Sequence, residues 1–127
     1  LQLICEYLRD NVNYYDWVGF YFSNKKKNIL TLGPFAGKST EHVQIPVGKG
    51  ICSQVAQKKE TMIVQDIKKE ENYLSCSIDV RSEIVVPILK DGNFIGELDI
   101  DSHSKSPFTT DDREFLERVC EMISILF

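Results

Sequence analysis

The stretch CSIDVRSEIVVPILKDGNFIGELDID, from Cys76 to Asp101, sets the architecture of this chain. Within it, Asp91-Gly92 stands between two apolar runs, and this dipeptide is the strongest short-range signal for a two-residue β-hairpin turn. We therefore expect two antiparallel strands that meet at this turn, with the other elements arranged around them.

The second strand of the hairpin alternates apolar and acidic side chains. The pattern assigns them to opposite faces: Phe94, Leu98 and Ile100 on one, Glu97, Asp99 and Asp101 on the other. Aspartate has low strand propensity, so two of them at period two are unusual. Like charges about 6 to 7 Å apart on one face repel each other and favour binding of a cation or a proton. The acidic end of this strand is therefore a candidate binding site.

Pro87 bears on whether Glu83 joins the acidic face. In a regular ladder closed by a two-residue turn, Glu83 would face Ile100 and point away from the aspartates. One bulge reverses that orientation. Because proline has no N–H for the ladder and is tolerated mainly at edges or bulges, we predict a bulge near Pro87 that places Glu83 on the acidic face.

Length and composition indicate one domain over residues 1–127. The chain has 127 residues, 43% of them hydrophobic, and a net charge of -4. A chain of this size can bury a single core. It has no basic stripe of the kind that nucleic acid requires and no apolar run long enough to span a membrane. We therefore expect neither nucleic acid nor a membrane as a partner.

The four cysteines match neither a zinc motif nor a dense disulfide framework, which favours a cytoplasmic chain with reduced thiols. Cys5 and Cys120 fall in apolar helical patterns and are interpreted as small buried hydrophobic residues. Cys52 and Cys76 lie instead beside glycine or polar residues. A metal site of Cys52, Cys76, His42 and His103 would have suitable ligand types, but no spacing supports it, so we expect no metal.

Cys52 and Cys76 have different surroundings. Cys52 falls in the first turn of a helix that runs to about Lys58, where the helix dipole would lower the pKa of the thiol. Packing under that helix beside Val55 is an equal alternative. Cys76 lies in the charged segment 66–81, and long loops of this kind are usually functional or disordered. A thiol on such a loop is accessible for redox or nucleophilic chemistry.

The remaining patterns predict an α+β fold with a mainly antiparallel sheet and the first and last helices on one face. Strand 17–22 places Trp17 and Tyr21 on one side, where the residues alone favour plain core packing over a role in a site. The last helix is capped by Thr109 or Thr110. Its predicted buried stripe, up to the end of the chain, is Phe115, Leu116, Val119, Cys120, Ile123 and Leu126.

Several motifs resemble those of GAF domains, in the branch of free methionine-(R)-sulfoxide reductases. The matching segments are WVGFY at 17–21, LGPFAGK at 32–38, IPVGKGIC at 45–52, Cys76, SEIVVP at 82–87 and GELDIDS at 96–102. The resemblance implies a GAF-like fold: a central, mainly antiparallel sheet of about six strands, the terminal helices on one face, and a short helix with a long active-site loop on the other.

The resemblance also implies roles for individual residues. Cys76 corresponds to the attacking cysteine and Cys52 to the resolving one. Residues that hold or line the substrate correspond to Glu83, Asp99, Asp101, Trp17 and Tyr21. The implied reaction is reduction of free methionine sulfoxide through a sulfenic acid and a Cys52–Cys76 disulfide, reset by a thioredoxin-like dithiol. We expect no cofactor, and a homodimer is left open.

Three positions depart from the family pattern. His42 stands where many members have a third cysteine, so a two-cysteine cycle is the most this chain could run. Ser53 replaces the glycine that usually follows the resolving cysteine, and residues 72–77 read NYLSCS instead of the usual GHIACD. The alternative function is a non-catalytic GAF module that binds a small ligand and signals through its terminal helices.

Overall fold

The computed structural model describes residues 1–70 and 79–127. Its helices are α1 (Gln2–Asn11), α2 (Gly50–Lys58), the short 3-10 helix η1 (Ile67–Lys69) and α3 (Thr110–Ser124). Its strands are β1 (Trp17–Asn24), β2 (Ile29–Ala36), β3 (Gln44–Pro46), β4 (Met62–Val64), β5 (Ser82–Lys90) and β6 (Asn93–Ser102). All six strands form one sheet in the order β3-β2-β1-β6-β5-β4, and neighbouring strands are antiparallel.

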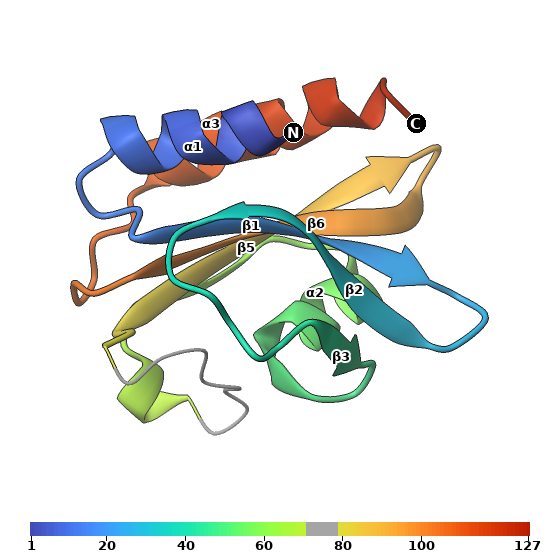
Figure 1. Ribbon diagram of the computed structural model, residues 1–127, viewed down its shortest axis with the longest axis horizontal. Helices are drawn as coiled ribbons and strands as arrows, with labels where there is room; N and C mark the ends of the chain where they lie inside the picture. The colour runs from blue at the N-terminus through green and yellow to red at the C-terminus, as the bar shows by residue number, and fades with distance from the viewer. Residues whose placement is uncertain (71–78) are drawn as a thin grey trace.

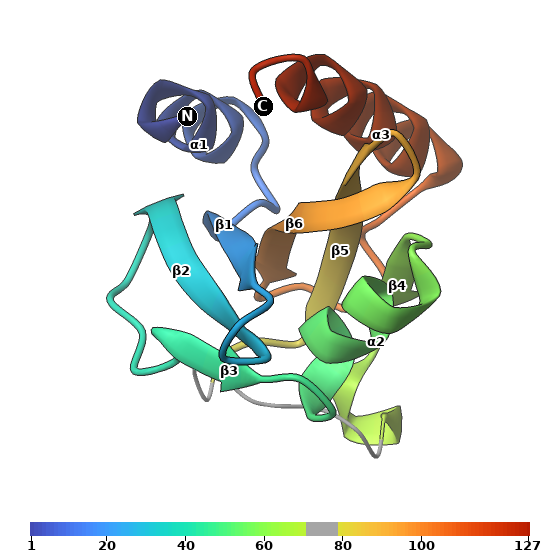
Figure 2. The same ribbon diagram turned by 90° about the vertical axis from the view of Figure 1, so that its right-hand side faces the viewer.

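The sheet separates two layers of helices. Helices α1 and α3 lie side by side over one face, and α2 covers the other face beneath the centre of the sheet (Figures 1 and 2). Both ends of the chain lie in the layer of the terminal helices (Figure 1). This arrangement confirms the predicted GAF-like α+β architecture. Within the described ranges, no helix is long and apolar enough to cross a membrane.

Each face of the sheet has its own apolar cluster, because alternate strand residues point to opposite faces. The cluster under α1 and α3 includes Val18, Phe20, Ile84, Val86, Leu98, Ile100, Leu116 and Cys120. The cluster on the α2 side includes Trp17, Tyr21, Leu30, Ile51, Cys52, Val55, Val85 and Phe94. Cys5 and Cys120 are both buried on the terminal-helix side, as the sequence predicts.

The β5–β6 hairpin contains the predicted irregularity close to Pro87. Pro87 pairs with Glu97 and Ile88 with Gly96, but the next residue, Leu89, pairs with Phe94. Ile95 is therefore an extra residue in β6, which makes it the bulge. A bulge near Pro87 is present as predicted and places Glu83 on the acidic face, but the pairing is regular through Pro87 itself and the extra residue lies beyond Ile88, in β6.

The bulge also corrects one assignment of the sequence pattern. Strict alternation placed Phe94 on the same face as Leu98 and Ile100. The extra residue reverses the face of the β6 residues that precede it. Phe94 consequently packs in the cluster on the α2 side, whereas Ile95 packs against the cluster under the terminal helices.

Helix α3 begins as predicted and ends earlier than predicted. Thr109 is its N-cap, and a reciprocal capping box joins Thr109 to Asp112. The helix ends at Ser124, so Leu126 leaves the predicted stripe and is 71% exposed. Phe115 is 47% exposed, because it lies at the edge of the helix face rather than against the sheet. Leu116, Cys120 and Ile123 are buried as expected.

Candidate functional site

The acidic face of the hairpin is gathered at one end of the sheet, on the α2 side. Strand pairing places Glu83 opposite Asp101, and Trp17 opposite Asp101 from the other neighbouring strand. Asp99 lies two residues along β6, opposite Val85. The three acidic side chains are almost fully buried: Glu83 is 5% exposed, Asp99 1% and Asp101 1%. The predicted convergence of these residues is therefore present.

Cys52 packs directly against this acidic group. It lies in the first turn of α2, is 5% exposed, and its Sγ donates a hydrogen bond to Asp99 Oδ2 at 3.5 Å. One ligand atom from each of Cys52, Glu83 and Asp99 lies within 4.8 Å of the others. Helix α2 thus carries the thiol to the carboxyl groups of the hairpin, across a long separation in sequence.

The thiol of Cys52 is not activated by the helix dipole. Burial raises its pKa well above the ordinary value of 9.0, and the neighbouring Asp99, Glu97 and Glu83 raise it further. The predicted lowering of this pKa is wrong, because helix N-terminal stabilisation is outweighed by desolvation and by acidic neighbours. The packed alternative that the sequence allowed is the one observed.

Asp99 is a carboxyl group with an elevated proton affinity. Burial raises its pKa above 3.8, while hydrogen bonds from Glu83 and Cys52 and the charge of His42 act in the opposite direction. Two carboxyl groups that hydrogen-bond to each other must share at least one proton. A proton held by the Glu83–Asp99 pair can be delivered to a bound group.

Glu97 is a buried acid that the site prediction did not include. Its side chain is 0% exposed, and neither carboxylate oxygen has a hydrogen-bond partner in the part of the chain that the structure describes. Burial raises its pKa well above 4.5. Its alternation with Asp99 and Asp101 in β6 is a signal that could have identified Glu97, but its burial near Cys52 depends on the tertiary fold.

Trp17 and Tyr21 form an aromatic wall beside the acidic group. Their ring centroids are 6.4 Å apart, and Trp17 stacks on Phe35 at 5.6 Å. The indole lies where a side chain at position 19 would collide with it, so Gly19 makes room for the ring. The Trp17 Nε1–H donates to the carbonyl oxygen of Lys38 at 3.0 Å.

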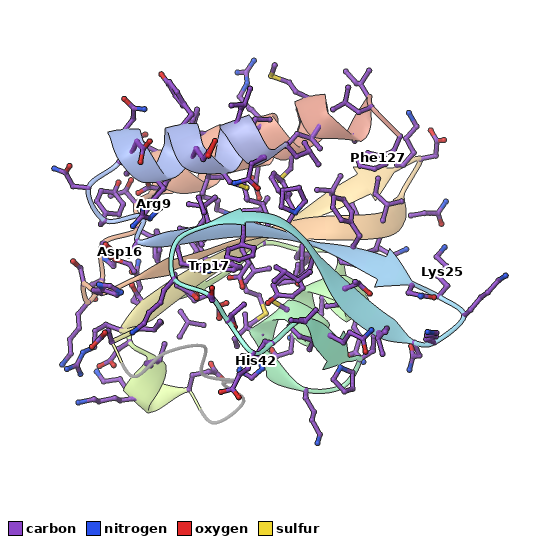
Figure 3. The ribbon with its side chains drawn as sticks, in the orientation of Figure 1. Arg9, Asp16, Trp17, Lys25, His42 and Phe127 are labelled. Carbon is purple, nitrogen blue, oxygen red and sulfur yellow. The ribbon has the colours of Figure 1, made fainter. Side chains whose placement is uncertain are left out.

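The wall also anchors the segment between β2 and β3. The Tyr21 hydroxyl donates to the carbonyl oxygen of His42 at 2.8 Å, which complements the bond from Trp17 near the start of that segment. Figure 3 shows Trp17 and His42 on the same side of the sheet, with Phe127 on the side of the terminal helices. Trp17 and Tyr21 therefore serve both packing and positioning, and the two interpretations of these residues are compatible.

Cavities flank the acidic group. A cavity of about 10 Å³ is lined by His42, Ile45, Lys49, Gly50, Ile51, Cys52, Glu83 and Asp99. A larger one, of about 110 Å³, is lined by residues that include Arg9, Trp17, Lys38, Asp101 and His103. Of the predicted substrate residues, Glu83 and Asp99 line the smaller cavity and Trp17 and Asp101 the larger one, whereas Tyr21 lines neither. A hollow of about 500 Å³ near Pro87 and Glu117 contains none of them.

Two other predictions concern thiols and metal ligands. Cys76 lies outside the described residues, so its role remains a prediction. The histidines of the rejected metal set do not converge: His42 lines the small cavity, whereas His103 lines the larger one and its Nδ1 is 3.8 Å from an Asp16 carboxylate oxygen. Arg9 lies beside Asp16 at the same end of the sheet (Figure 3) and donates to its carbonyl oxygen.

Comparison with known proteins agrees with this architecture. The model of the GAF domain family matches residues 1–127. The chain belongs to the GAF domain family. A free methionine-R-sulfoxide reductase of Saccharomyces cerevisiae is 41% identical to this GAF domain over 111 residues, which are 86% of the chain and 61% of the yeast protein. The domain thus spans about three fifths of that relative's length.

Solved structures of similar proteins superpose closely on this GAF domain. A type II free methionine-R-sulfoxide reductase from Thermoplasma acidophilum has a TM-score of 0.94 and 38% identity, covering 98% of this chain and 87% of that one. A free methionine-R-sulfoxide reductase from Neisseria meningitidis, in complex with its substrate, has a TM-score of 0.93 and 34% identity, covering 98% and 74%.

Proposed function

We propose that this GAF domain reduces free L-methionine-(R)-sulfoxide to methionine with its own cysteine thiols. The observation that carries the proposal is the contact between Cys52 and the buried carboxyl group of Asp99, within the acidic cluster beside an aromatic wall. The names of the similar yeast, Thermoplasma and Neisseria proteins support the same activity. A buried thiol among carboxyl groups suits chemistry that needs both a redox centre and a proton donor.

The acidic cluster accounts for recognition of a free amino acid. A methionine sulfoxide that is not in a peptide carries an α-ammonium group, and the carboxylates of Glu83, Asp99 and Asp101 can bind it. Trp17 and Tyr21 offer an apolar surface for the thioether end. An amide nitrogen in a peptide lacks the positive charge, so the same cluster would disfavour peptide-bound substrates.

The first chemical step is attack of the Cys76 thiolate on the substrate sulfur. The sulfoxide oxygen transfers to Cys76 as a sulfenic acid and methionine leaves, with one proton consumed. The Glu83–Asp99 pair supplies that proton, because burial raises the pKa of Asp99. The substrate sulfur is reduced by two electrons and the Cys76 sulfur is oxidised by two.

The second step closes a disulfide. The Cys52 sulfur attacks the Cys76 sulfenic acid, an S–S bond forms, and the hydroxyl group leaves as water. Because Cys52 is a thiol at neutral pH, its proton must be removed during the attack, and Asp99 Oδ2 is positioned to accept it at 3.5 Å. A thioredoxin-like dithiol then reduces the disulfide. The cycle needs no third cysteine, so it can run although His42 stands where many family members have one.

The activity is tested by incubating the reduced protein with free methionine-(R)-sulfoxide and dithiothreitol and measuring methionine. We expect sustained production by the wild type and none by Cys76→Ser. Cys120→Ala is the matched control, because Cys120 lies on the opposite face of the sheet under α3, away from the acidic cluster. Equal production by wild type and Cys76→Ser would refute the proposal.

A ligand-binding sensor module is the second candidate, and one surface feature favours it. An apolar groove between α1 and α3 is lined by Ile4, Tyr7, Leu8, Phe115, Val119, Met122, Ile123 and Leu126. Terminal helices with such a surface could pair two copies as a homodimer and transmit ligand binding. Binding of methionine sulfoxide with no turnover would favour this candidate. We also propose a cytoplasmic location, where thiols stay reduced.

A further inference from the structure

The small cavity beside Cys52 has the size and lining of an ion site. Its volume of about 10 Å³ is about the minimum that one water molecule or small ion needs. Three potential ligands, the Cys52 sulfur and carboxylate oxygens of Glu83 and Asp99, lie within 4.8 Å of one another at its wall. His42 lines the same cavity from the segment between β2 and β3. Sulfur and oxygen donors thus lie together at the wall of a cavity that His42 also lines.

The spacing of two of these donors fits a tetrahedral ion. With Zn–S near about 2.3 Å and Zn–O near about 2.1 Å, a tetrahedral angle places sulfur and oxygen about 3.6 Å apart. The Cys52 Sγ and Asp99 Oδ2 are 3.5 Å apart. These two side chains therefore need little or no movement to bind the same Zn²⁺ ion.

A second observation is independent of that spacing. Asp99 is 1% exposed, lines the cavity, and its Oδ1 has no hydrogen-bond partner within residues 1–70 and 79–127. A buried carboxylate oxygen without a partner is costly, and ion binding would remove that cost. The backbone of His42 is held at the cavity by the hydrogen bond from the Tyr21 hydroxyl to its carbonyl oxygen.

We propose that this cavity is a binding site for one Zn²⁺ ion, with Cys52, Glu83, Asp99 and His42 as ligands. The donor set of thiolate, imidazole and carboxylates is one that Zn²⁺ prefers in proteins. The cation also neutralises the acidic cluster, which is otherwise repulsive.

Zinc bound here would regulate the reductase. This consequence rests on the proposed function: the ion occupies the place of the substrate ammonium group and holds Cys52 as a ligand, so it blocks both substrate binding and disulfide closure. Removal of the ion by a chelator restores both. Closure of the Cys52–Cys76 disulfide removes the thiolate ligand, so the oxidised protein binds Zn²⁺ weakly.

The test uses the reduced, untagged, chelator-treated protein under anaerobic conditions. Zn²⁺ alone is titrated against a chromophoric chelator, and Co²⁺ alone is added as a spectroscopic probe. We expect one ion per chain and a thiolate-to-Co²⁺ charge-transfer band that is absent in Cys52→Ser. His42→Ala should weaken Zn²⁺ binding by at least about tenfold. His103→Ala, the other histidine, is the matched control and should bind as the wild type does.

Three results would overturn the zinc site: no saturable binding, a charge-transfer band that persists in Cys52→Ser, or equal effects of His42→Ala and His103→Ala. None of them depends on turnover. Methionine production by the metal-free protein is measured in parallel. If Zn²⁺ binds as described and the metal-free protein makes no methionine, the reductase proposal fails while the ion site stands.

Discussion

The thiol of Cys52 donates a hydrogen bond to Asp99 Oδ2 at 3.5 Å, which joins the first turn of α2 to the acidic end of β6. The partners are 47 residues apart in sequence. The bond places a thiol with a raised pKa beside a carboxyl group that can accept its proton. The expected behaviour of the proposed redox cycle follows from this pairing.

The disulfide-closing step should accelerate as pH rises. Because the pKa of Cys52 is raised well above 9.0, its thiolate fraction is small near neutral pH and grows with each unit of pH. Rapid alkylation after a single turnover, followed by mass spectrometry, measures the rate at which Cys52 is consumed. A rate that stays constant between about pH 6 and pH 9 would show that Cys52 reacts as a preformed, low-pKa thiolate.

Substrate affinity should depend on the charge of the acidic cluster. Asp101→Asn removes one carboxylate that can bind the substrate ammonium group, and loss of a charge-assisted hydrogen bond of about 1.5–3 kcal/mol corresponds to a KM increase of roughly 10- to 100-fold. Steady-state kinetics with free methionine-(R)-sulfoxide measures the change. An N-acetylated substrate should be reduced poorly by the wild type for the same reason.

The matched control for this variant is Asp91→Asn, at the exposed turn of the same hairpin and far from the acidic cluster. It removes the same charge from the chain. Asparagine also tolerates the positive φ of 52° at this position. Equal KM values for Asp101→Asn and Asp91→Asn, or efficient reduction of the acetylated substrate, would mean that the acidic cluster does not bind the ammonium group.

Ionisation of the buried Glu97 side chain should lower the free energy of unfolding. Its pKa is raised above 4.5 by burial in the folded state, so the unfolded chain ionises first as pH rises and the free energy of unfolding falls. Glu97→Leu should therefore raise the free energy of unfolding at neutral pH by about 1–3 kcal/mol. Urea unfolding of wild type, Glu97→Leu and Glu97→Gln measures it.

The advantage of Glu97→Gln over wild type should grow as pH rises above 4.5 and disappear below it. Glu114→Gln is the control, because Glu114 is exposed on α3 and should show no such trend. A difference between wild type and Glu97→Gln that is independent of pH would indicate that Glu97 is neutral throughout or has a buried partner.

Asp112 should be the strongest single anchor of α3. It accepts hydrogen bonds from the hydroxyl groups of Tyr14 at 2.7 Å and Tyr15 at 2.6 Å, and from the Thr109 amide at 2.8 Å. Asp112→Ala removes the capping box and leaves the buried Tyr15 hydroxyl without this acceptor, so we expect a loss of about 2–4 kcal/mol. Thermal or urea unfolding measures the loss.

The contribution of Asp112 to stability should depend on pH in the opposite direction to that of Glu97. Burial would raise the pKa of Asp112, but its hydrogen bonds lower it below 3.8, so its stabilisation is present above that pH and is lost as pH falls through the lower value. Asp111→Ala, at the exposed neighbouring position, should cost less than about 1 kcal/mol. Equal losses from the two variants would argue against the capping role.

The sequence predicts the sheet and its acidic face because those features follow from local patterns. Turn chemistry at Asp91-Gly92 and the missing N–H of Pro87 predict the hairpin and its bulge, and through them the convergence of Glu83 with Asp101. Phe94 was misassigned because alternation alone does not reveal which strand contains the extra residue. The bulge at Ile95 reverses its face.

The chemistry of Cys52 could not be predicted from its neighbours in sequence. Position in a first helical turn favours a low pKa, but the observed pKa depends on Asp99, Glu97 and Glu83, which only the tertiary fold brings to the thiol. The burial of Glu97 is missed for the same reason. Local patterns indicate which face a side chain occupies, and packing against another element determines its depth and protonation.

The most direct test of the central claim is a single turnover without reductant. Reduced protein is mixed with excess free methionine-(R)-sulfoxide, methionine is quantified, and the protein is digested under non-reducing conditions for mass spectrometry. The proposed cycle predicts about one methionine per chain and a peptide pair linked through Cys52 and Cys76. No methionine, or methionine without that linked pair, would contradict it.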